Sequence, residues 1–514
     1  MSGINQSQAL PPSRTVAVIG SGAMGAGIAQ VAAAAGYSVQ LFDTRAEAVV
    51  KAIADIGGMF DKLAGKGRMT AAEAGAAKAR LRPASALSEL AEAGLVVEAI
   101  VENLDVKRKL FADLEAVVAD DCIFASNTSS ISITSIGAAL RLPQRLVGMH
   151  FFNPVPLMAL VEIISGLASD AAVAGCVYDT ALAWGKNPVH TKSTPGFIVN
   201  RVARPYYAEA LRILNEQAAE PATIDAILRE AGGFRMGPFE LMDLIGHDVN
   251  FAVTQSVFHA YFTDPRFTPS LIQQELVNAG FLGRKSGRGF YRYGDAAAMP
   301  EPATEAAAAR PSGVVQLHGT GPLAEALAAR LGGMSVERST PSGVDNLVLQ
   351  CGNAKAYLTD GRSATQRAAD NGHADTVLID LALDFNKATR VAVTRADQCS
   401  DAAYAAIVAL LQAAGFAVSR LDDVPGMAVM RTVAMLANEA ADTVNQGVCS
   451  AADADMAMQK GVNYPRGPLA WADAIGLDTV AGVLSHLAAA YGEDRYRVSP
   501  LIMRKTASKG KFHA

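Results

Sequence analysis

The sequence has little of what would place it among nucleic-acid, membrane or secreted proteins. Its 45 Lys and Arg against 50 Asp and Glu give a net charge of −5, so no basic excess is available for nucleic acid or an anionic membrane surface. No uninterrupted apolar run approaches the roughly 18 residues of a membrane span. Residues 1–13 lack the basic flank and apolar core of a signal peptide, and we expect them to form a disordered lead-in.

Cysteine is scarce as well. The five cysteines are odd in number and form no C-x-x-C pair, which argues against a disulfide framework and against a thiolate metal site. This usage favours the reducing cytoplasm, and we expect no metal. The composition is 50% hydrophobic and 18% charged, which is ample for large cores. At roughly 150 residues per domain, the 514 residues predict three or four domains, and the pattern favours an enzyme.

The first chemical signal is a glycine-rich turn between a strand and a helix. A β-branched strand at 15–19 runs into Gly20-Ser21-Gly22-Ala23-Met24-Gly25, then into an alanine-rich helix and a second strand that ends at Asp43. Glycines in this order allow a tight turn, close approach of backbone amides to a pyrophosphate and close helix packing. Asp43 can accept both ribose hydroxyls and would repel a 2′-phosphate, so NAD is favoured over NADP. A purely structural glycine turn is the alternative.

The alternation of strands and helices continues. Further strands are expected at 95–102, 122–130 and 146–152, separated by amphipathic helices. This pattern predicts a parallel, doubly wound Rossmann-type sheet with ligands at the carboxyl ends of its strands. Polar residues gather at those ends, namely Glu102, Asn103, Asn127, Thr128, Ser129, Ser130, His150 and Asn153.

One carboxylate interrupts an otherwise apolar strand. Glu162 lies within 159–164, beside the strand that ends near His150. A buried carboxylate is costly unless it meets a donor or cation, and an imidazole would serve. Glu162 would then orient the ring and leave its other nitrogen to act as a base. Each residue alone also has a structural interpretation, His150 as a core histidine and Glu162 as a charge at a strand edge.

Six segments together resemble the L-3-hydroxyacyl-CoA dehydrogenase family. They are IGSGAMGAGIAQVAA, VVEAIVENLDVK, ASNTSSISITSI, GMHFFNPVPLM-LVEII, TPGFIVNR and GPFELMDLIG, in order between about residues 14 and 292. The resemblance implies oxidation of (S)-3-hydroxyacyl-CoA to 3-oxoacyl-CoA with NAD⁺. No hydratase-type or thiolase-type region is evident in the sequence, so we expect one activity, and the charge and hydropathy given above predict no nucleic-acid or membrane partner.

The resemblance also implies roles for single residues. His150 and Glu162 match the catalytic pair, and Ser129 and Asn200 match groups at the reacting oxygen and the thioester. Positions matching NAD contacts are Gly20, Gly22, Ala23, Met24, Gly25, Asp43, Glu102, Lys107, Ser129, Asn153 and Lys285. Lys66 matches a lysine that contacts CoA, although Met59 stands where a serine is frequent.

The second half repeats part of the first at a constant spacing of 230 residues. Pro195-Gly196 matches Pro425-Gly426, Arg201 matches Arg431, and Gly237-Pro238 matches Gly467-Pro468. This predicts a duplicated helical domain over 195–292 and 424–510. Asn200 corresponds to Met430, so the copy lacks the polar group at the thioester position. Gly319-x-Gly321 and the strands near 376–383, 388–395 and 415–421 indicate a degenerate Rossmann-like domain, a structural relic with His318 as a loop residue.

The expected fold is therefore an α/β Rossmann-type domain, an all-α helical domain, a degenerate Rossmann-like domain and a second helical copy. The predicted segments are a lead-in 1–13, an NAD-binding domain 14–194, a helical substrate or dimerisation domain 195–294, a linker 295–312, a degenerate domain 313–423 and a second helical domain 424–510. We expect the two helical copies to pair within the chain. A homodimer is left open.

The full layout most resembles long bacterial family members that act on 3-hydroxyadipyl-CoA in aerobic phenylacetate breakdown. Arg204 lies four residues beyond Asn200, on the same helix face, and its guanidinium suits the far carboxylate of a six-carbon diacid. A structural ion pair or solvent exposure of Arg204 is the alternative. The rival functions are a short-chain 3-hydroxybutyryl-CoA dehydrogenase, a lysine-dependent β-hydroxyacid dehydrogenase and an NAD-binding scaffold.

Overall fold

The structure, a computed structural model, describes residues 8–294, 298–309, 314–331, 336–339 and 346–513. Its contacts divide the chain into two units. Unit 1 comprises Met1–Arg201 and Gln446–Val462, and unit 2 comprises Val202–Asn445 and Asn463–Ala514. A short segment of the second half thus belongs to the unit built mainly from the first.

Unit 1 contains an eight-stranded sheet in the order β3-β2-β1-β4-β5-β6-β7-β8. Its strands are β1 Thr15–Ile19, β2 Val39–Phe42, β3 Leu81–Ala84, β4 Ala93–Glu98, β5 Ile123–Ser126, β6 Leu146–Phe151, β7 Leu160–Ser165 and β8 Asn187–Lys192. The first six are mutually parallel, in the doubly wound order that the sequence predicted. β7 runs antiparallel to β6, and β8 follows β7 in parallel.

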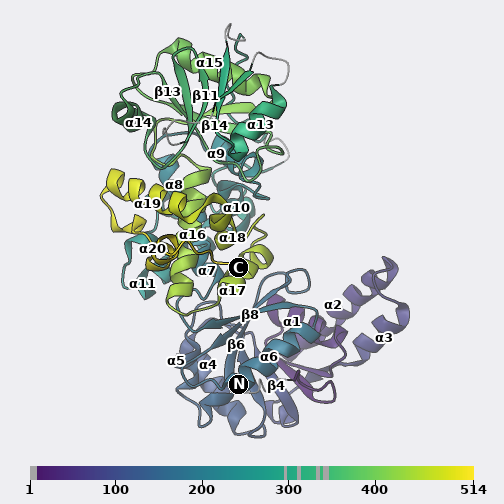
Figure 1. The fold of residues 1–514 in the computed structure, drawn as a ribbon. Coiled ribbons are helices and arrows are strands. Elements are labelled where there is room, and N and C mark those ends of the chain that lie inside the picture. The colour runs from purple at the N-terminus through teal and green to yellow at the C-terminus, as the bar shows by residue number, and fades with distance from the viewer. Residues whose placement is uncertain (1–7, 295–297, 310–313, 332–335, 340–345, 514) are drawn as a thin grey trace. The chain divides into compact units, whose positions relative to one another are not determined.

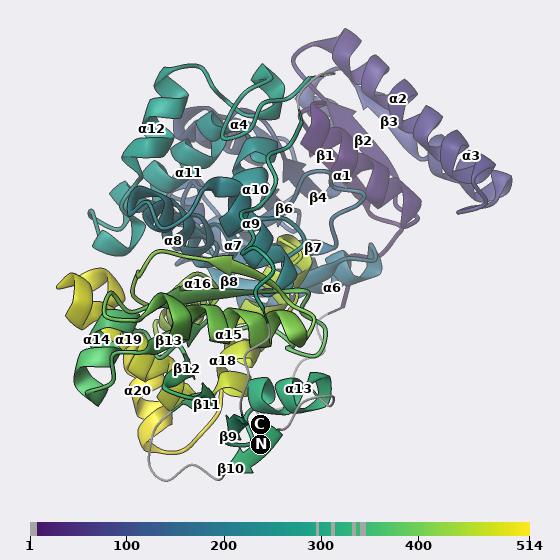
Figure 2. The same ribbon diagram turned by 90° about the horizontal axis from the view of Figure 1, so that it is seen from above.

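Helices cover this sheet because its strands are buried on both faces. Every residue of β4 and β6 is buried, which explains their continuous apolar sequences. The helices are α1 Ala23–Ala34, α2 Ala46–Gly65, α3 Ala71–Ala79, α4 Leu104–Glu115, α5 Ile133–Gly137, α6 Ala171–Ala183, α7 Val199–Val202 and, from the second half, α17 Ala451–Gly461. Figure 2 shows α2 and α3 lying side by side next to β3.

The expected disordered lead-in does not extend over residues 8–13. Leu10 is 6% exposed, its N–H donates to Thr180 Oγ1, and its carbonyl accepts the Tyr37 hydroxyl. The apolar side chain is buried in the core beside β1, and this burial with two hydrogen bonds offsets the cost of ordering the segment. Residues 1–7 lie outside the described part of the chain.

Unit 2 contains a second sheet, with seven strands in the order β10-β9-β11-β12-β13-β14-β15. They are β9 Val315–His318, β10 Val336–Ser339, β11 Leu347–Cys351, β12 Ala354–Leu358, β13 Thr376–Ile379, β14 Arg390–Arg395 and β15 Ala417–Arg420. Three of its pairings are antiparallel. β11 runs antiparallel to both of its neighbours, β9 and β12, and β14 runs antiparallel to β13, as β7 does to β6. The degenerate Rossmann-like domain is confirmed, with α13 Pro322–Arg330, α14 Ala364–Asn371 and α15 Asp401–Ala413 around the sheet.

The remaining helices of unit 2 surround the long helix α16, Val429–Asn445. Figure 1 shows α16 next to α8, α18, α19 and α20, and the contacts between these helices agree. The helices of this region are α8 Arg204–Asn215, α9 Pro221–Glu230, α10 Pro238–Ile245, α11 His247–Ala260, α12 Leu271–Asn278, α18 Pro468–Ile475, α19 Leu477–Tyr491 and α20 Pro500–Ala507. The buried stripe of α16 continues through most of its length, as expected for a central helix.

The repeat at a spacing of 230 residues is visible in these bounds, and it is longer than the sequence predicted. α10 and α18 correspond residue for residue. The correspondence continues upstream of the helical copies, because α6 matches α15 and β7 matches β14 without a shift. The duplication therefore includes the last strands of both sheets.

The predicted linker 295–312 is described only at 298–309. In that part the backbone N–H of Ala303 donates to Thr223 Oγ1, and the N–H of Glu305 donates to the Val418 carbonyl. The segment contains no helix or strand at 298–309 and is held by these bonds within unit 2.

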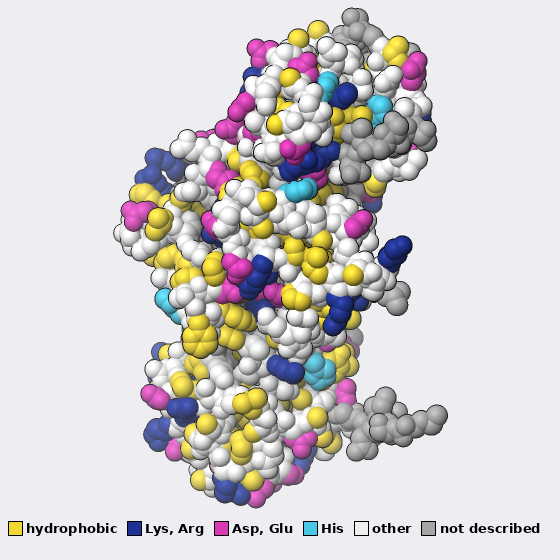
Figure 3. Space-filling view, turned by 60° about the vertical axis from the view of Figure 1, so that its left-hand side comes forward, with side chains coloured by type: hydrophobic (Ala, Val, Ile, Leu, Met, Phe, Trp, Pro, Cys, Tyr) yellow, Lys and Arg dark blue, Asp and Glu magenta, His cyan; other side chains and the backbone are white. Residues whose placement is uncertain are grey.

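Two surface observations bear on the expected partners. On the face drawn in Figure 3, basic and acidic side chains are intermixed rather than gathered by sign. No single helix in the described ranges is long and apolar enough to cross a membrane. The bent pair α18 and α19 passes that test only when both helices are taken together.

Candidate active site

The antiparallel turn from β6 to β7 brings His150 and Glu162 directly opposite each other. His150 Nδ1 and Glu162 Oε2 are 2.7 Å apart, and the two side chains are 7% and 0% exposed. The second carboxylate oxygen, Oε1, accepts the backbone N–H groups of Ile198 and Val199 at 2.9 and 3.0 Å, where α7 begins. Both oxygens of Glu162 are therefore satisfied, which makes its complete burial tolerable.

The imidazole ring is held by apolar neighbours as well. The ring centroid of Phe152 lies 4.5 Å from that of His150, and that of Phe197 lies at 5.9 Å. With Nδ1 bound to Glu162, Nε2 has no hydrogen bond to any described residue. The arrangement can thus present Nε2 as a proton acceptor or donor to a ligand while the carboxylate fixes the tautomer.

Glu102 organises the turn that follows β5. Its Oε1 accepts the Thr128 hydroxyl at 2.6 Å and the backbone N–H groups of Ser129 and Ser130 at 2.9 and 3.1 Å. Burial opposes ionisation, but the Thr128 bond and the charge of Lys107 hold the pKa of Glu102 below its ordinary value. The carboxylate therefore stays charged and fixes this serine turn.

The serine turn contacts α7 through Asn200. The Ser129 carbonyl accepts Nδ2 of Asn200 at 3.4 Å, so two of the predicted substrate contacts lie together. Asn127 Oδ1 accepts the Phe151 N–H at 2.8 Å and ties the end of β5 to the end of β6. The pair of His150 and Glu162, called the dyad below, is thus anchored to the serine turn.

Beneath Glu102 lies a buried ion pair that the sequence analysis missed. Glu98 at the end of β4 is 0% exposed and accepts Lys107 Nζ at 2.6 Å and the Ser126 hydroxyl at 2.6 Å. Lys107 is only 1% exposed and also reaches Glu102 Oε2 at 3.2 Å. Lys107 therefore positions Glu102. The signal for Glu98 was available, because it is a carboxylate inside an apolar strand, just as Glu162 is.

The glycine turn fits a dinucleotide. Gly20 has φ +102°, and a Cβ there would lie 2.5 Å from the Ala99 carbonyl oxygen. A Cβ at Gly25 would lie 1.9 Å from the Gly20 oxygen, whereas one at Gly22 would meet nothing within 4 Å. Gly22 caps α1 without a side-chain bond, so the first amides of the helix remain available to a phosphate.

Asp43 stands at the end of β2, as predicted, and is held by Ser21. The Ser21 backbone N–H and hydroxyl donate to Asp43 Oδ2 at 2.9 and 2.8 Å. Burial opposes ionisation, yet these bonds keep the pKa of Asp43 below its ordinary value. Its negative charge supports the preference for NAD over a cofactor with a 2′-phosphate.

The other predicted site residues are distributed over both units. Ala23 and Met24 begin α1 in unit 1, where Asn153 is exposed and joins Pro154 through a cis peptide bond. Lys66 is exposed at the end of α2. Lys285 and Arg204 belong to unit 2. Lys285 Nζ bonds Asp248 at 2.7 Å.

Arg204 is buried, contrary to one of the alternatives considered for it. It is 5% exposed, and its Nη1 donates to Thr254 Oγ1 at 3.0 Å. Its guanidinium carbon lies 4.9 Å from the ring centroid of Tyr207. Ala203 keeps a helical conformation between α7 and α8, so Pro205 does not turn Arg204 into solvent.

Three family models match the chain. The model described as "3-hydroxyacyl-CoA dehydrogenase, NAD binding domain" matches residues 15–194. The model described as "3-hydroxyacyl-CoA dehydrogenase, C-terminal domain" matches twice, at residues 196–293 and 426–513. A "3-hydroxybutyryl-CoA dehydrogenase reduced Rossmann-fold domain" matches residues 356–425. The two matches of the second model correspond to the two helical copies.

Individual proteins agree with these models. The chain is 44% identical over 501 residues to a 3-hydroxyadipyl-CoA dehydrogenase of Escherichia coli, which covers 98% of this chain and 99% of that protein. It is 41% identical over 287 residues to a 3-hydroxybutyryl-CoA dehydrogenase of Bradyrhizobium diazoefficiens, covering 56% of this chain and 98% of that protein. A crystal structure described as 3-hydroxybutyryl-CoA dehydrogenase from E. coli has a TM-score of 0.88 and 43% identity, and covers 96% of this chain and 98% of that one.

Proposed function

The chain belongs to the 3-hydroxyacyl-CoA dehydrogenase family and is an NAD-dependent oxidoreductase, and on that premise we propose that it oxidises (S)-3-hydroxyadipyl-CoA at C3 with His150 and Glu162 as its acid–base pair. The observation that carries the proposal is the pairing of β6 with β7, which sets the two side chains opposite each other at 2.7 Å.

His150 is the base for the 3-hydroxyl group in this proposal. Its Nε2 takes the hydroxyl proton, and Glu162 Oε2 holds the Nδ1–H tautomer and stabilises the imidazolium that forms. NAD, when bound, supplies the acceptor for the hydride that leaves C3. In the reverse direction His150 returns the proton. Such acid–base help is worth roughly 10²–10⁴-fold in rate.

Ser129 and Asn200 complete the proposed site. The serine hydroxyl would hold the reacting oxygen, and the amide of Asn200 would face the thioester. Their support is the bond of 3.4 Å between Asn200 Nδ2 and the Ser129 carbonyl, together with the anchoring of the serine turn on Glu102. Lys66 is the proposed CoA contact, supported by its exposure at the end of α2.

Turnover with acyl-CoA substrates tests the function. Formation of NADH is measured with (S)-3-hydroxyadipyl-CoA and with (S)-3-hydroxybutyryl-CoA. The diacid is expected to give the higher kcat/KM. A higher value for hydroxybutyryl-CoA would favour the short-chain alternative, which the description of the similar E. coli crystal structure names. If no 3-hydroxyacyl-CoA led to reduction of NAD, the NAD-binding scaffold would be the remaining interpretation.

Arg204 is our candidate for reading the far carboxylate. It is buried, carries donors in a planar fork and lies four residues beyond Asn200. Arg204→Leu is expected to lower kcat/KM for hydroxyadipyl-CoA by roughly 10–100-fold, the scale of about 1.5–3 kcal/mol for a hydrogen bond to a charged group. The value for hydroxybutyryl-CoA should stay level or rise.

The matched control is Arg235→Leu, since Arg235 is an exposed arginine of the same unit. This substitution should leave kcat/KM unchanged for both substrates. Equal losses on both substrates in Arg204→Leu would make Arg204 a structural residue and place selectivity elsewhere.

We also propose that the two helical copies form a pseudo-twofold pair. In a twofold pair each contact has a mirror contact with the roles of the copies exchanged. The N–H of Lys192 donates to the Val448 carbonyl at 2.9 Å in unit 1, and 230 residues on the N–H of Asp422 donates to the Ala218 carbonyl at 2.9 Å in unit 2. These bonds are mirror partners under the repeat.

Two more contacts follow the same rule. Arg201 Nη1 bonds Gln446 Oε1 at 2.8 Å within unit 1, and the equivalent Arg431 Nη1 bonds Glu216 Oε2 at 3.3 Å within unit 2. The packing of helices on the two sheets is reciprocal as well. α17 of the second copy packs on β7 and β8, and α9 of the first copy packs on β14. Such reciprocity supports an internal pair in place of a dimer of single-copy chains.

The assembly and location of the enzyme stay predictions. A further homodimer is open to measurement by light scattering. The five cysteines, all in the described ranges, are free, which fits the predicted reducing cytoplasm. A place in phenylacetate breakdown rests on the resemblance to long bacterial members of the family.

A further inference from the structure

Unit 2 contains a cavity of about 380 Å³ where the two helical copies meet. One wall is the α8 face that carries Arg204, Tyr207 and Leu211, and another is the segment Tyr491–Tyr496 of the second copy. Five guanidinium groups line it: Arg204, Arg212, Arg266, Arg431 and Arg495. The volume lies within the range of roughly 300–1,000 Å³ usual for small-molecule sites.

Some of these arginines are bound to carboxylates. Arg431 is 0% exposed and bonds Glu209 at 2.7 Å and Glu216 at 3.3 Å. It therefore contributes to the structure of the cavity lining and not to ligand binding. Arg495 bonds Glu493 and is 15% exposed. Glu216 and Glu493 are the carboxylates that line the cavity. Arg212 pairs with Glu209, and Arg266 pairs with Glu439 and Asp442, so four of the five arginines have a carboxylate partner.

Arg266 supplies a donor that lacks an acceptor. It is 3% exposed, and its Nη1 and Nη2 bond Asp442 and the Arg497 carbonyl. Its Nε is buried with no hydrogen-bond partner among the described residues. A buried N–H without an acceptor is unfavourable and needs an explanation, such as a bound ion, water or ligand group. The donor belongs to a residue that lines the cavity.

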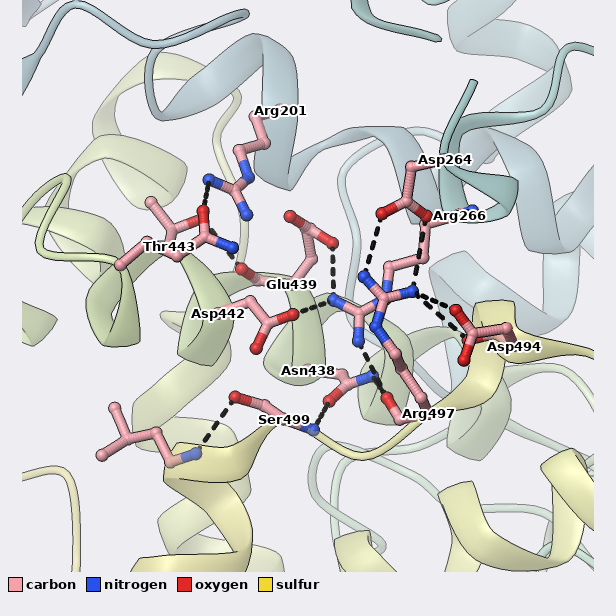
Figure 4. A network of polar contacts seen from close by, with 12 residues as sticks. Arg201, Asp264, Arg266, Asn438, Glu439, Asp442, Thr443, Asp494, Arg497 and Ser499 are labelled. Atoms are coloured by element: carbon pink, nitrogen blue, oxygen red, sulfur yellow. Dashed lines mark hydrogen bonds and ion pairs between the residues drawn. The ribbon is translucent and has the colours of Figure 1, made fainter. Parts of the chain in front are cut away.

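The second copy differs at the corresponding place. There Asn438 of α16 donates to the Arg497 carbonyl and accepts the Ser499 N–H, which ties α16 to the start of α20 (Figure 4). The first copy has Ala208 and Pro269 at the positions of Asn438 and Ser499, so it cannot form this bridge. The wall that the first copy contributes to the cavity therefore lacks this bridge.

From these observations we propose that the cavity binds the carboxylate of a short aliphatic acid. Guanidinium groups bind carboxylates in a bidentate fork. The neighbouring Leu211, Phe267 and Leu271 offer apolar surface to an aliphatic chain. The carboxylate has two possible sources, the far end of the acyl substrate or a free dicarboxylate. The first source rests on the proposed function, and the second does not.

Calorimetric titration of the full chain with free adipate tests the cavity. Adipate is expected to bind, and 1,6-hexanediol, which has the same chain length but no carboxylate, is expected to bind at least tenfold more weakly. Arg495→Met and Thr254→Leu should each weaken adipate binding at least tenfold. The second substitution introduces the residue found at the equivalent position 484 and removes the hydroxyl that bonds Arg204.

Arg395→Met is the matched control. Arg395 also bonds a carboxylate, that of Asp401, and lies 5.4 Å from the ring centroid of Tyr404, but on β14 away from the cavity lining. It should bind adipate as the wild type does. Absence of adipate binding to the wild type, or equal binding by the cavity variants and the wild type, would overturn the proposal. Circular dichroism confirms that each variant is folded.

Kinetics separate the two sources. If the substrate supplies the carboxylate, adipate competes with hydroxyadipyl-CoA, and Arg495→Met lowers kcat/KM for the diacid at least tenfold more than for hydroxybutyryl-CoA. If a free dicarboxylate is the ligand, adipate binds but the ratio of the two substrates is unchanged in Arg495→Met. Either result supports the cavity as a carboxylate site. If the protein bound adipate but had no dehydrogenase activity, the proposed function would be wrong and the proposed carboxylate site would still stand.

Discussion

The two halves of the chain use the same backbone arrangement at the end of their sheets, but only one carries an imidazole. Under the repeat, His150 corresponds to Asp380 and Glu162 corresponds to Ala392. Asp380 Oδ2 accepts the N–H groups of Ala428 and Val429 at 2.9 and 2.7 Å. Glu162 does the same for the equivalent amides of the first copy.

This difference separates a structural requirement from a chemical one. Both copies need a carboxylate at the first amides of the following helix, because those N–H groups have no partner within the helix. In the second copy the aspartate occupies the strand position of the histidine and meets the amides directly. In the first copy the carboxylate stands on the next strand and holds an imidazole as well. The second copy keeps the fold but has no imidazole at the position of His150.

The sharpest test of this comparison is His150→Gln. We expect kcat to fall by roughly 10²–10⁴-fold, because the acid–base group is removed. NADH binding, measured by titration, should be unchanged, since the glycine turn and Asp43 are intact. Asp380→Asn, the matched change in the second copy, should leave kcat unchanged. A near-wild-type kcat in His150→Gln, or an equal loss in both variants, would break the distinction.

The copies also depend on each other, which Arg431→Met tests. Arg431 of the second copy bonds Glu209 of the first at 2.7 Å, and both side chains are 0% exposed. Removing one partner of a buried ion pair costs about 3–5 kcal/mol of the free energy of unfolding. Denaturant titration measures this loss, with Met in place of the exposed Arg235 as the control. A loss no larger than that of the control would argue against coupled copies.

Glu162→Gln asks how much the carboxylate adds to the imidazole. The side-chain amide oxygen of the introduced glutamine can still accept the N–H groups of Ile198 and Val199. The neutral amide cannot offset the positive charge of an imidazolium. We expect kcat to fall by roughly 10–100-fold, the scale of a charged hydrogen bond. Steady-state kinetics across pH measure the effect. A variant with wild-type kcat and pH profile would remove Glu162 from the dyad.

The smallest expected effect is a pH dependence of stability from Asp380. Burial raises its pKa to about 6, although the N–H groups of Met430 and Val429 act in the opposite direction. Between its ordinary pKa and this value the folded state keeps a proton that the unfolded state has released. Stability from this group therefore decreases as pH rises, by about 1 kcal/mol between pH 5 and pH 7. Asp380→Asn should lack this component in urea titrations. Identical pH dependence in both proteins would contradict it.

Part of the site follows from local sequence. The spacing of Gly20, Gly22 and Gly25 between a strand and a helix depends on neighbouring residues only, and the structure places Asp43 at the end of the next strand as predicted. Other parts were missed. Glu98 and Lys107 are nine residues apart and meet only because α4 packs beside the end of β4. Sequence reasoning treated Lys107 as a cofactor contact without its buried partner.

The repeat gives the same lesson over a longer range. Invariant pairs such as Gly237-Pro238 and Gly467-Pro468 made the helical duplication visible in the sequence. The correspondence of β7 with β14 was not visible, because their sequences LVEIIS and RVAVTR share only one identical residue, Val161 and Val391, while the strands keep the same bounds under the repeat. The equivalence of His150 and Asp380 therefore follows from the matched bounds of the strands and helices around them.

The sequence by itself determined the glycine turn, the acid after the second strand, one imidazole and one carboxylate in apolar strands, and a second helical copy. These depend on residue type and on contacts between near neighbours. Only the tertiary structure decided the antiparallel direction and register of β7 against β6, which confirm the expected pairing of Glu162 with His150, and the packing of α17 on β7 and β8 and of α9 on β14. It alone opened the arginine-lined cavity. Such contacts join residues from 12 positions apart, as His150 and Glu162 are, to 287 positions apart, as Tyr496 and Glu209 are. Packing, not local propensity, selects them.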